Sequence, residues 1–197
     1  GNSQSSGNIS LVTSTKANCP TCAVINLPVD TQGGIKVANI TTKGQINLMA
    51  GGDVQAGILN SSGVGQFGGQ VFILTNSNSA TLNEFMVGGS GPNSVLSVTV
   101  GAGSEGAGAI GITSGGGGGI NVSNREALLF QMPVQGWGIS LGLNAKNGTL
   151  TTSGNWNADG IVSGDGGRVN LAGKTINFTD TVNISANGVG EGSGGSV

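Results

Sequence analysis

The chain has 197 residues, of which 40 are Gly, and only 8% of its residues are charged, with a net charge of −2. Disordered segments combine low hydrophobicity with high net charge, and collagens are rich in Pro. This chain is 36% hydrophobic and has only 4 Pro, so neither class fits. Its 7 basic residues are too few to neutralise a nucleic-acid backbone. The composition therefore predicts a folded, charge-poor protein that does not bind nucleic acid.

The chain contains no His, which excludes Ser-His-Asp and Cys-His catalysis and removes the commonest metal ligand. No apolar run is long enough to cross a membrane as a helix, so we expect no transmembrane segment. Residues 1–197 match the usual length of one domain, and we expect a single domain that needs no cofactor.

The first distinctive motif is Cys19-Pro20-Thr21-Cys22, which has the spacing of a redox or metal motif. A thioredoxin-like site needs a βαβ unit after the motif, and a zinc site needs two further ligands. The sequence offers neither. A local disulfide between Cys19 and Cys22 is therefore the favoured interpretation, and it implies an oxidising compartment. Two free thiols in a reducing cell are the alternative.

Short runs in which apolar and polar residues alternate recur along the whole chain, separated by Gly, Asn and Ser. A period of two places alternate side chains on one face of a β-strand. The pattern therefore predicts strands with inward apolar residues, which are Ile9 and Leu11, Ile35 and Val37, Ile46 and Leu48, Val71 and Ile73, and Val95, Val98 and Val100.

Residues 115–135 interrupt this alternation. Consecutive Gly residues fill positions 115–119, and the stretch from Asn124 to Val134 is the least repetitive part of the chain. We expect this segment to form an excursion packed over one face of the molecule. A short helix is an alternative for part of it.

The segment Asn155-Trp156-Asn157-Ala158-Asp159-Gly160 resembles the first half of a calcium loop, which has oxygen ligands at alternate positions and Gly at the sixth. Asp165 would add a second carboxylate, but Gly166 stands where the loop needs a bidentate Glu. Asn155, Asn157, Asp159 and Asp165 therefore form a weak calcium candidate. An Asn-rich β-turn is the alternative.

The clearest strand pattern lies near the C-terminus. Three apolar pairs, each separated by one Asn, predict three short strands; the pairs are Val169 and Leu171, Ile176 and Phe178, and Val182 and Ile184. The separators, residues 172–175 and 179–181, are too short for a hairpin loop with a change of register. They predict corners at which one strand bends into the next.

Gly-rich starts mark where such units begin. The start Gly166-Gly167-Arg168-Val169 has a counterpart 28 positions later, Gly194-Gly195-Ser196-Val197, and similar starts occur at 68–71, 33–35, 136–139 and, less clearly, 108–110. Periods of 20–50 residues are typical of stacked architectures. Short strands joined by corners then predict an all-β fold, a parallel β-helix (β-solenoid) of about seven coils with Gly-rich loops.

The C-terminal repeat resembles the repeat region of the filamentous haemagglutinin-type exoproteins, the secreted adhesins of bacterial two-partner secretion. The Gly-Gly-x-Val start, the Val-Asn-Leu, Ile-Asn-Phe and Val-Asn-Ile-Ser-Ala runs and the closing Gly-rich segment carry the resemblance, and residues 34–56 are similar to the same repeats. It implies a right-handed parallel β-helix that an outer-membrane transporter exports. It also implies an extracellular location at the bacterial cell surface and attachment to glycans or proteins of host cells or other surfaces.

These features favour a structural and adhesive protein without a catalytic centre, a segment of a longer repeat protein or filament. One alternative is a self-assembling filament subunit whose coil ends stack on one another. Another is a β-helix protein that binds or degrades polysaccharides, although the 9 acidic residues are far apart in the sequence. Ice binding would need Thr ladders at a constant phase, which the sequence lacks.

Seven Asn residues are followed by x-Ser or x-Thr and are weak candidates for N-glycosylation. Asn and Thr are frequent in this chain, so several matches are expected by chance. Outward ladders of Asn and Thr on strands are the alternative interpretation. The seven residues are Asn8, Asn39, Asn60, Asn121, Asn147, Asn177 and Asn183.

Overall fold

The structure is a computed structural model that describes residues 7–13, 33–63, 66–75 and 84–197. All paired strands in these ranges run parallel, and most belong to one 13-stranded sheet. The single helical element among the described residues is the short 3-10 turn Arg125–Ala127. The predicted all-β class is confirmed. No described helix has the length and apolar character needed to cross a membrane.

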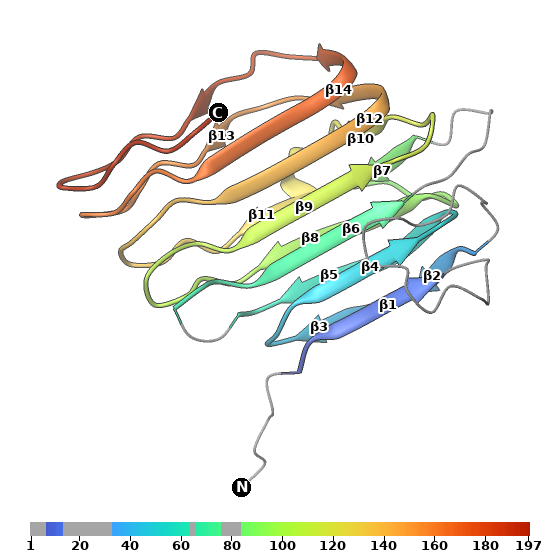
Figure 1. Cartoon of the computed structure of the whole chain (residues 1–197), viewed down its shortest axis with the longest axis horizontal. Coiled ribbons are helices and arrows are strands. Elements are labelled where there is room, and N and C mark those ends of the chain that lie inside the picture. Colours follow the sequence, from blue (N-terminus) through green and yellow to red (C-terminus); the bar gives the residue numbers. More distant parts are fainter. Residues whose placement is uncertain (1–6, 14–32, 64–65, 76–83) are drawn as a thin grey trace, which may run out of the picture.

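The first layer of strands lies side by side in chain order (Figure 1). Its members are β1 (Ile9–Thr13), β4 (Ile46–Ala50), β6 (Gln70–Thr75), β9 (Ala109–Ser114), the long β12 (Ser140–Thr152) and β14 (Arg168–Phe178). Each strand therefore pairs with the strand that the chain forms on its previous pass through this layer.

The second layer lies behind the first in Figure 1. Its strands are β2 (Ile35–Val37), β3 (Ile40–Thr42), β5 (Val54–Ser61), β7 (Phe85–Val87), β8 (Ser94–Val100), β10 (Ile120–Val122) and β11 (Leu128–Phe130). The start of β12 pairs with β9 and its end pairs with β10, so the sheet passes from one layer to the other and nearly closes. β13 (Trp156–Asn157) and β15 (Ile184–Ser185) form a separate two-stranded sheet.

The core consists of rows of inward side chains that continue from strand to strand. One row runs Ile9, Ile46, Val71, Ile110, Leu141 and Val169, and the next runs Leu11, Leu48, Ile73, Ile112, Leu143 and Leu171. The central members of both rows are buried. The predicted inward positions at Val95, Val98 and Val100 are also buried, on β8. The predicted inward positions are therefore buried or partly buried, although the spacing from Val95 to Val98 departs from a period of two.

At the ends of several strands, the last inward side chain is a buried Ser or Thr instead of an apolar residue. The Thr75 and Ser61 hydroxyls donate hydrogen bonds to the carbonyl oxygens of Gly52 and Gly44, at 2.7 and 2.6 Å. Both side chains are fully buried, and the hydrogen bonds remove the cost of burying their polar atoms. The corners are therefore held by polar contacts between successive passes of the chain.

Most predicted Gly-rich starts lie at one edge of the first layer, directly before β6, β9, β12 and β14. The start at Gly194–Gly195 leads to Ser196, which forms a parallel bridge with Arg168. Gly33–Gly34 is an exception, because it precedes β2, which pairs with β5 in the second layer. The corresponding first-layer position is Gly44, before β4.

The structure corrects the prediction of three C-terminal strands. Residues 172–175 do not form a corner that ends a strand, since β14 continues through them to Phe178. A register shift opposite, between Ala145 and Thr149 on β12, absorbs the change in direction without breaking the pairing. Val182 lies outside the strands, and only Ile184 of the last predicted pair belongs to one.

Two short strands of the segment 115–135 belong to the sheet, so the segment is not only an excursion over one face. β10 pairs with β7 and β12, and β11 pairs with β8. The alternative prediction, a short helix in this segment, corresponds only to the 3-10 turn Arg125–Ala127. Ile120, Val122 and Leu128 are buried, which explains why a segment without clear alternation still enters the core.

Candidate functional site

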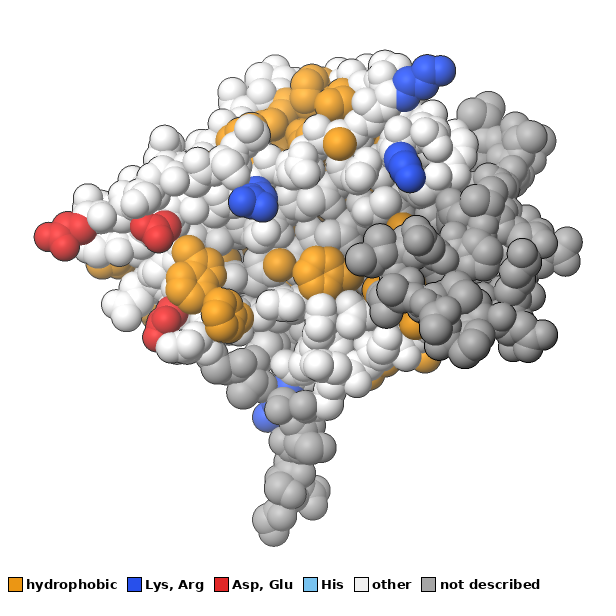
Figure 2. Space-filling model, viewed as in Figure 1, with side chains coloured by type: hydrophobic (Ala, Val, Ile, Leu, Met, Phe, Trp, Pro, Cys, Tyr) orange, Lys and Arg blue, Asp and Glu red, His pale blue; other side chains and the backbone are white. Residues whose placement is uncertain are grey.

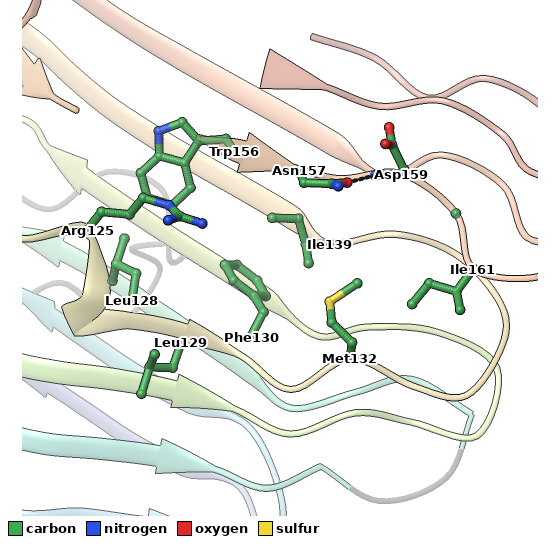
Figure 3. A pocket seen from close by; sticks show the side chains of 11 residues that line it. Arg125, Leu128, Leu129, Phe130, Met132, Ile139, Trp156, Asn157, Asp159 and Ile161 are labelled. Carbon is green, nitrogen blue, oxygen red and sulfur yellow. Dashed lines mark hydrogen bonds between the residues drawn. The ribbon is translucent and has the colours of Figure 1, made fainter. Parts of the chain in front are cut away.

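A groove of about 380 Å³ opens between β11 and β13. β11 pairs with β8 and β13 pairs with β15, so these two strands leave a break in the second layer. Figure 3 shows apolar side chains from both sides of this break, with Phe130 and Met132 facing Ile139 and Ile161. The groove is therefore an apolar hollow on which side chains of several elements converge.

Arg125 closes one end of the groove. Its guanidinium lies 5.4 Å from the centre of the Trp156 ring, a cation–π arrangement visible in Figure 3. Trp156 is itself buried, and its indole Nε1 has no hydrogen-bond partner among the described residues. Trp156 therefore supports the floor of the groove and offers little ring surface to a ligand.

Asp159 is the acidic residue among the described residues that line the groove. Its Oδ1 accepts hydrogen bonds from the backbone N and the side-chain Nδ2 of Asn187, at 2.7 and 3.1 Å. In Figure 3 this carboxylate points away from the apolar side chains. The Asp159 carboxylate is therefore engaged by Asn187 and does not face the apolar hollow.

The calcium candidates are spread along a ladder between successive passes of the chain. Asn155 Oδ1 accepts a hydrogen bond from Asn183 Nδ2 at 3.0 Å, and Asp165 Oδ1 accepts one from Ser193 N at 2.6 Å. Each partner is 28 residues further along, as it is for Asp159. Asn157 Oδ1 accepts from the backbone N of Asp159, which is the geometry of an Asx turn. The Asx turn agrees with the alternative interpretation, an Asn-rich turn, and the weak calcium site stays a prediction.

Several sequon Asn side chains also bridge successive passes. Asn8 and Asn39 each accept a hydrogen bond through Oδ1, from the backbone N of Gln45 at 2.9 Å and of Ile58 at 2.8 Å. Outward ladders of Asn and Thr occur in the registers Thr41, Asn60 and Thr99, and Asn121, Thr151 and Asn177. These contacts give the Asn residues a structural role, and glycosylation of any of the seven stays a prediction.

Cys19 and Cys22 lie outside the described residues. The disulfide between them stays a prediction from the sequence.

A second candidate surface follows the edge where the chain enters the first layer. Phe67, just before β6, and Trp137, just before β12, have ring centroids 5.4 Å apart at an interplanar angle of 37°. Phe67 is 61% exposed. In Figure 2 apolar side chains gather at this left-hand edge, beside acidic ones. An aromatic pair is thus presented on the surface and not in the core.

Two polar hollows flank the aromatic pair. The hollow beside Phe67 has a volume of about 430 Å³ and presents Asn8, Lys43, Gln45 and Gln70. The hollow beside Trp137 has a volume of about 490 Å³ and presents Ser140, Asp165, Arg168 and Ser196. Glycine backbone from the stacked starts forms much of the remaining wall of both.

Comparison with known proteins gives no relative: no family model, no curated protein and no solved structure matches the chain. The similarity to haemagglutinin-type repeats therefore stays a prediction that rests on the quoted motifs.

The sequence did not predict that Phe67 and Trp137 form a pair. A signal was present, because Phe67 directly precedes Gly68–Gly69 and Trp137 stands between Gly136 and Gly138. Both aromatics thus occupy Gly-rich starts, which the stacking places at one edge.

Proposed function

We propose that the chain is a structural and adhesive segment of an extracellular bacterial surface protein, built as a right-handed β-solenoid shaft. The observation that carries the proposal is the in-register continuation of the inward rows, from Ile9 to Val169, through parallel strands. Stacked repeats in which each unit contacts its neighbours are typical of extended scaffolds. The resemblance to haemagglutinin-type repeats points to the same role.

The first layer supports the proposed number of coils. β1, β4, β6, β9, β12 and β14 give one pass each, and the bridge from Ser196 to Arg168 begins another, in line with about seven coils. Right-handed crossovers between parallel strands of one sheet are almost universal, which favours the proposed hand.

The outward surface fits a scaffold that works outside the cell. Figure 2 shows mostly uncharged polar and backbone atoms on the visible face, with acidic side chains at the left-hand edge and separate basic ones elsewhere. Such a surface supports neither nucleic-acid binding nor the focused field of a charged substrate site. The proposed partners are therefore glycans or proteins of the surface to which the protein attaches, together with the transporter that exports it.

Accessibility on whole cells tests this proposal. Antibodies raised against the purified chain should label intact source cells, and protease added outside should remove the signal while a cytosolic marker survives. Beads coated with the chain should attach to cells or surfaces more than beads coated with a non-adhesive protein of similar size. A protected, internal protein or equal attachment of both beads would contradict the proposal.

A second candidate function is a filament subunit, and the β14 end of the stack favours it. In the described part of the chain, the first residue of β14, Arg168, bridges Ser196, and the rest of β14 pairs with β12 alone. The inward-type side chains Ile176 and Phe178 are 40% and 49% exposed there, and Figure 2 shows apolar side chains at this end. An exposed apolar strand edge is a template for pairing with another strand.

Sedimentation of the purified chain at increasing concentration tests the filament alternative. We expect large assemblies that Ile176→Lys reduces to monomers, because a charge would enter the interface between copies. Met132→Lys, which places a charge on a similarly exposed apolar residue in the groove, should leave assembly unchanged. A wild-type chain that stays monomeric at high concentration would exclude this alternative.

A further inference from the structure

We propose that the edge formed by the strand starts of the first layer binds a neutral, linear polysaccharide, with Phe67 and Trp137 as the stacking platform. The inference rests on the proposed adhesive function, for which it supplies a ligand class and a site. It begins from the exposure of Phe67, whose burial would be favourable and which the fold instead holds at the surface.

The chain holds the aromatic platform in place through specific contacts. Gly106 forms a parallel bridge with Trp137, and a Cβ atom there would be only 2.0 Å from Trp137 Nε1, so Gly is required for the indole to lie against this backbone. Trp137 N donates to the carbonyl oxygen of Glu105 at 3.1 Å, and Gln66 Nε2 donates to Glu105 Oε1 at 2.8 Å. The two rings are therefore positioned by three successive passes of the chain.

The hollows on either side supply hydrogen-bonding groups that the fold does not use. The side-chain amides of Gln45 and Gln70 make no hydrogen bond to any described residue, and each offers both donors and an acceptor. On the other side, Asp165 uses Oδ1 for Ser193 and Arg168 uses Nε for Ser196, which leaves Oδ2 and the terminal guanidinium nitrogens.

This combination matches the chemistry of a sugar chain. A pyranose ring has an apolar C–H face, which stacks on an aromatic ring, and a rim of hydroxyls, which bond to amide, carboxylate and guanidinium groups. Lys43 and Arg168 are balanced by Glu105 and Asp165 along this edge, so a polyanion gains no net attraction. The edge spans about 24 Å over the strands from β1 to β14, which suits a linear chain of several sugars.

Affinity electrophoresis of the purified 197-residue chain tests the inference. Gels would contain hydroxyethylcellulose, galactomannan or xylan as neutral probes and polygalacturonate as an anionic probe. We expect at least one neutral polysaccharide to slow the wild-type chain. Phe67→Ala should weaken this binding about tenfold, since it removes half of the platform. Phe178→Ala, at another exposed Phe beyond this edge, should bind as the wild type does.

Three results would overturn the inference: no retardation by any neutral polysaccharide, stronger retardation by polygalacturonate than by the neutral probes, or equal binding by wild type and Phe67→Ala. Circular dichroism would confirm that each variant keeps its fold. Failure here is separate from failure of the proposed function, because surface labelling of intact cells does not depend on polysaccharide binding.

Discussion

At the scale of single residues, close backbone contacts decide which side chains the corners accept. A Cβ atom at Gly167 would lie 1.9 Å from the carbonyl oxygen of Ile139 on the previous pass, and one at Gly69 would lie 1.8 Å from that of Ser61. Backbone N–H groups at the same corners donate across the gap, for example from Arg168 to Ile139 at 2.8 Å. Gly at these corners therefore permits close backbone contact between neighbouring segments of the chain.

Gly167→Ala and Gly142→Ala separate this packing effect from the general cost of changing Gly. Gly167→Ala should lower the free energy of unfolding by about 3 kcal/mol, because the backbone must move to admit the methyl group. Gly142 lies in β12, and a Cβ atom there would meet no other atom within 4 Å, so Gly142→Ala should change stability by less than about 0.5 kcal/mol. Urea unfolding measures both, and similar losses would contradict the corner account.

Val162 has a φ of 60°, in the left-handed region, and is therefore strained. Among the described residues other than Gly, it is the one with a positive φ. This conformation costs a β-branched residue about 1–2 kcal/mol of conformational free energy, and Asn adopts it more readily. Val162→Asn should therefore raise the free energy of unfolding by about 1 kcal/mol. Val134→Asn changes another exposed Val, which has no positive φ, and should have little effect. Thermal unfolding of both variants measures the difference. Equal effects of the two substitutions would argue against strain.

At the scale of strands, the contribution of an inward side chain to stability depends on whether its strand lies inside the sheet or at its edge. Leu143 on β12 and Leu171 on β14 are register partners in one inward row. Leu143 has β9 on its other side and is fully buried, whereas Leu171 belongs to β14 and is only partly buried. The same residue type in the same row thus meets two degrees of burial.

Leu143→Ala should cost about 2–5 kcal/mol, because it opens a cavity inside the stack. Leu171→Ala should cost about 1 kcal/mol, since its side chain is only partly buried and loses less contact. Chemical denaturation of both variants gives the comparison. A cost at Leu171 equal to that at Leu143 would show that the β14 end is covered in solution.

At the scale of the whole molecule, local patterns predicted the class of structure but not its layers. Alternation identified inward residues such as Ile46 and Val71, because burial on one face of a strand has a period of two. The continuous β14 and the incorporation of β11 depend on the neighbouring pass of the chain, which no local pattern specifies. Hydrogen-bonded partners on successive passes are 19 residues apart at Asn39 and 37 apart at Asn8, so the register could not be counted from a fixed repeat.

The candidate sites show the same limit. The Asn and Asp positions of the calcium candidate were recognisable as a turn from spacing alone, since Asn157 and Asp159 contact each other locally. The contact between Phe67 and Trp137 joins rings from distant parts of the sequence and needs the strand register before it can be expected. Sequence patterns therefore located local turns and missed surfaces that stacking assembles.

Disulfide trapping at Asn47 tests the parallel, in-register stack most directly. In a chain with Cys19 and Cys22 replaced by Ser, Asn47→Cys should form a disulfide with Ser10→Cys in one variant and with Phe72→Cys in another, because both are its register partners. Asn47→Cys with Leu74→Cys is the control, since Leu74 pairs with Met49 and a shift of two residues exceeds the reach of a disulfide. Mass spectrometry of non-reduced peptides should detect the first two bonds and not the third. Absence of both register bonds in the folded protein, or equal trapping of the control, would contradict the stack.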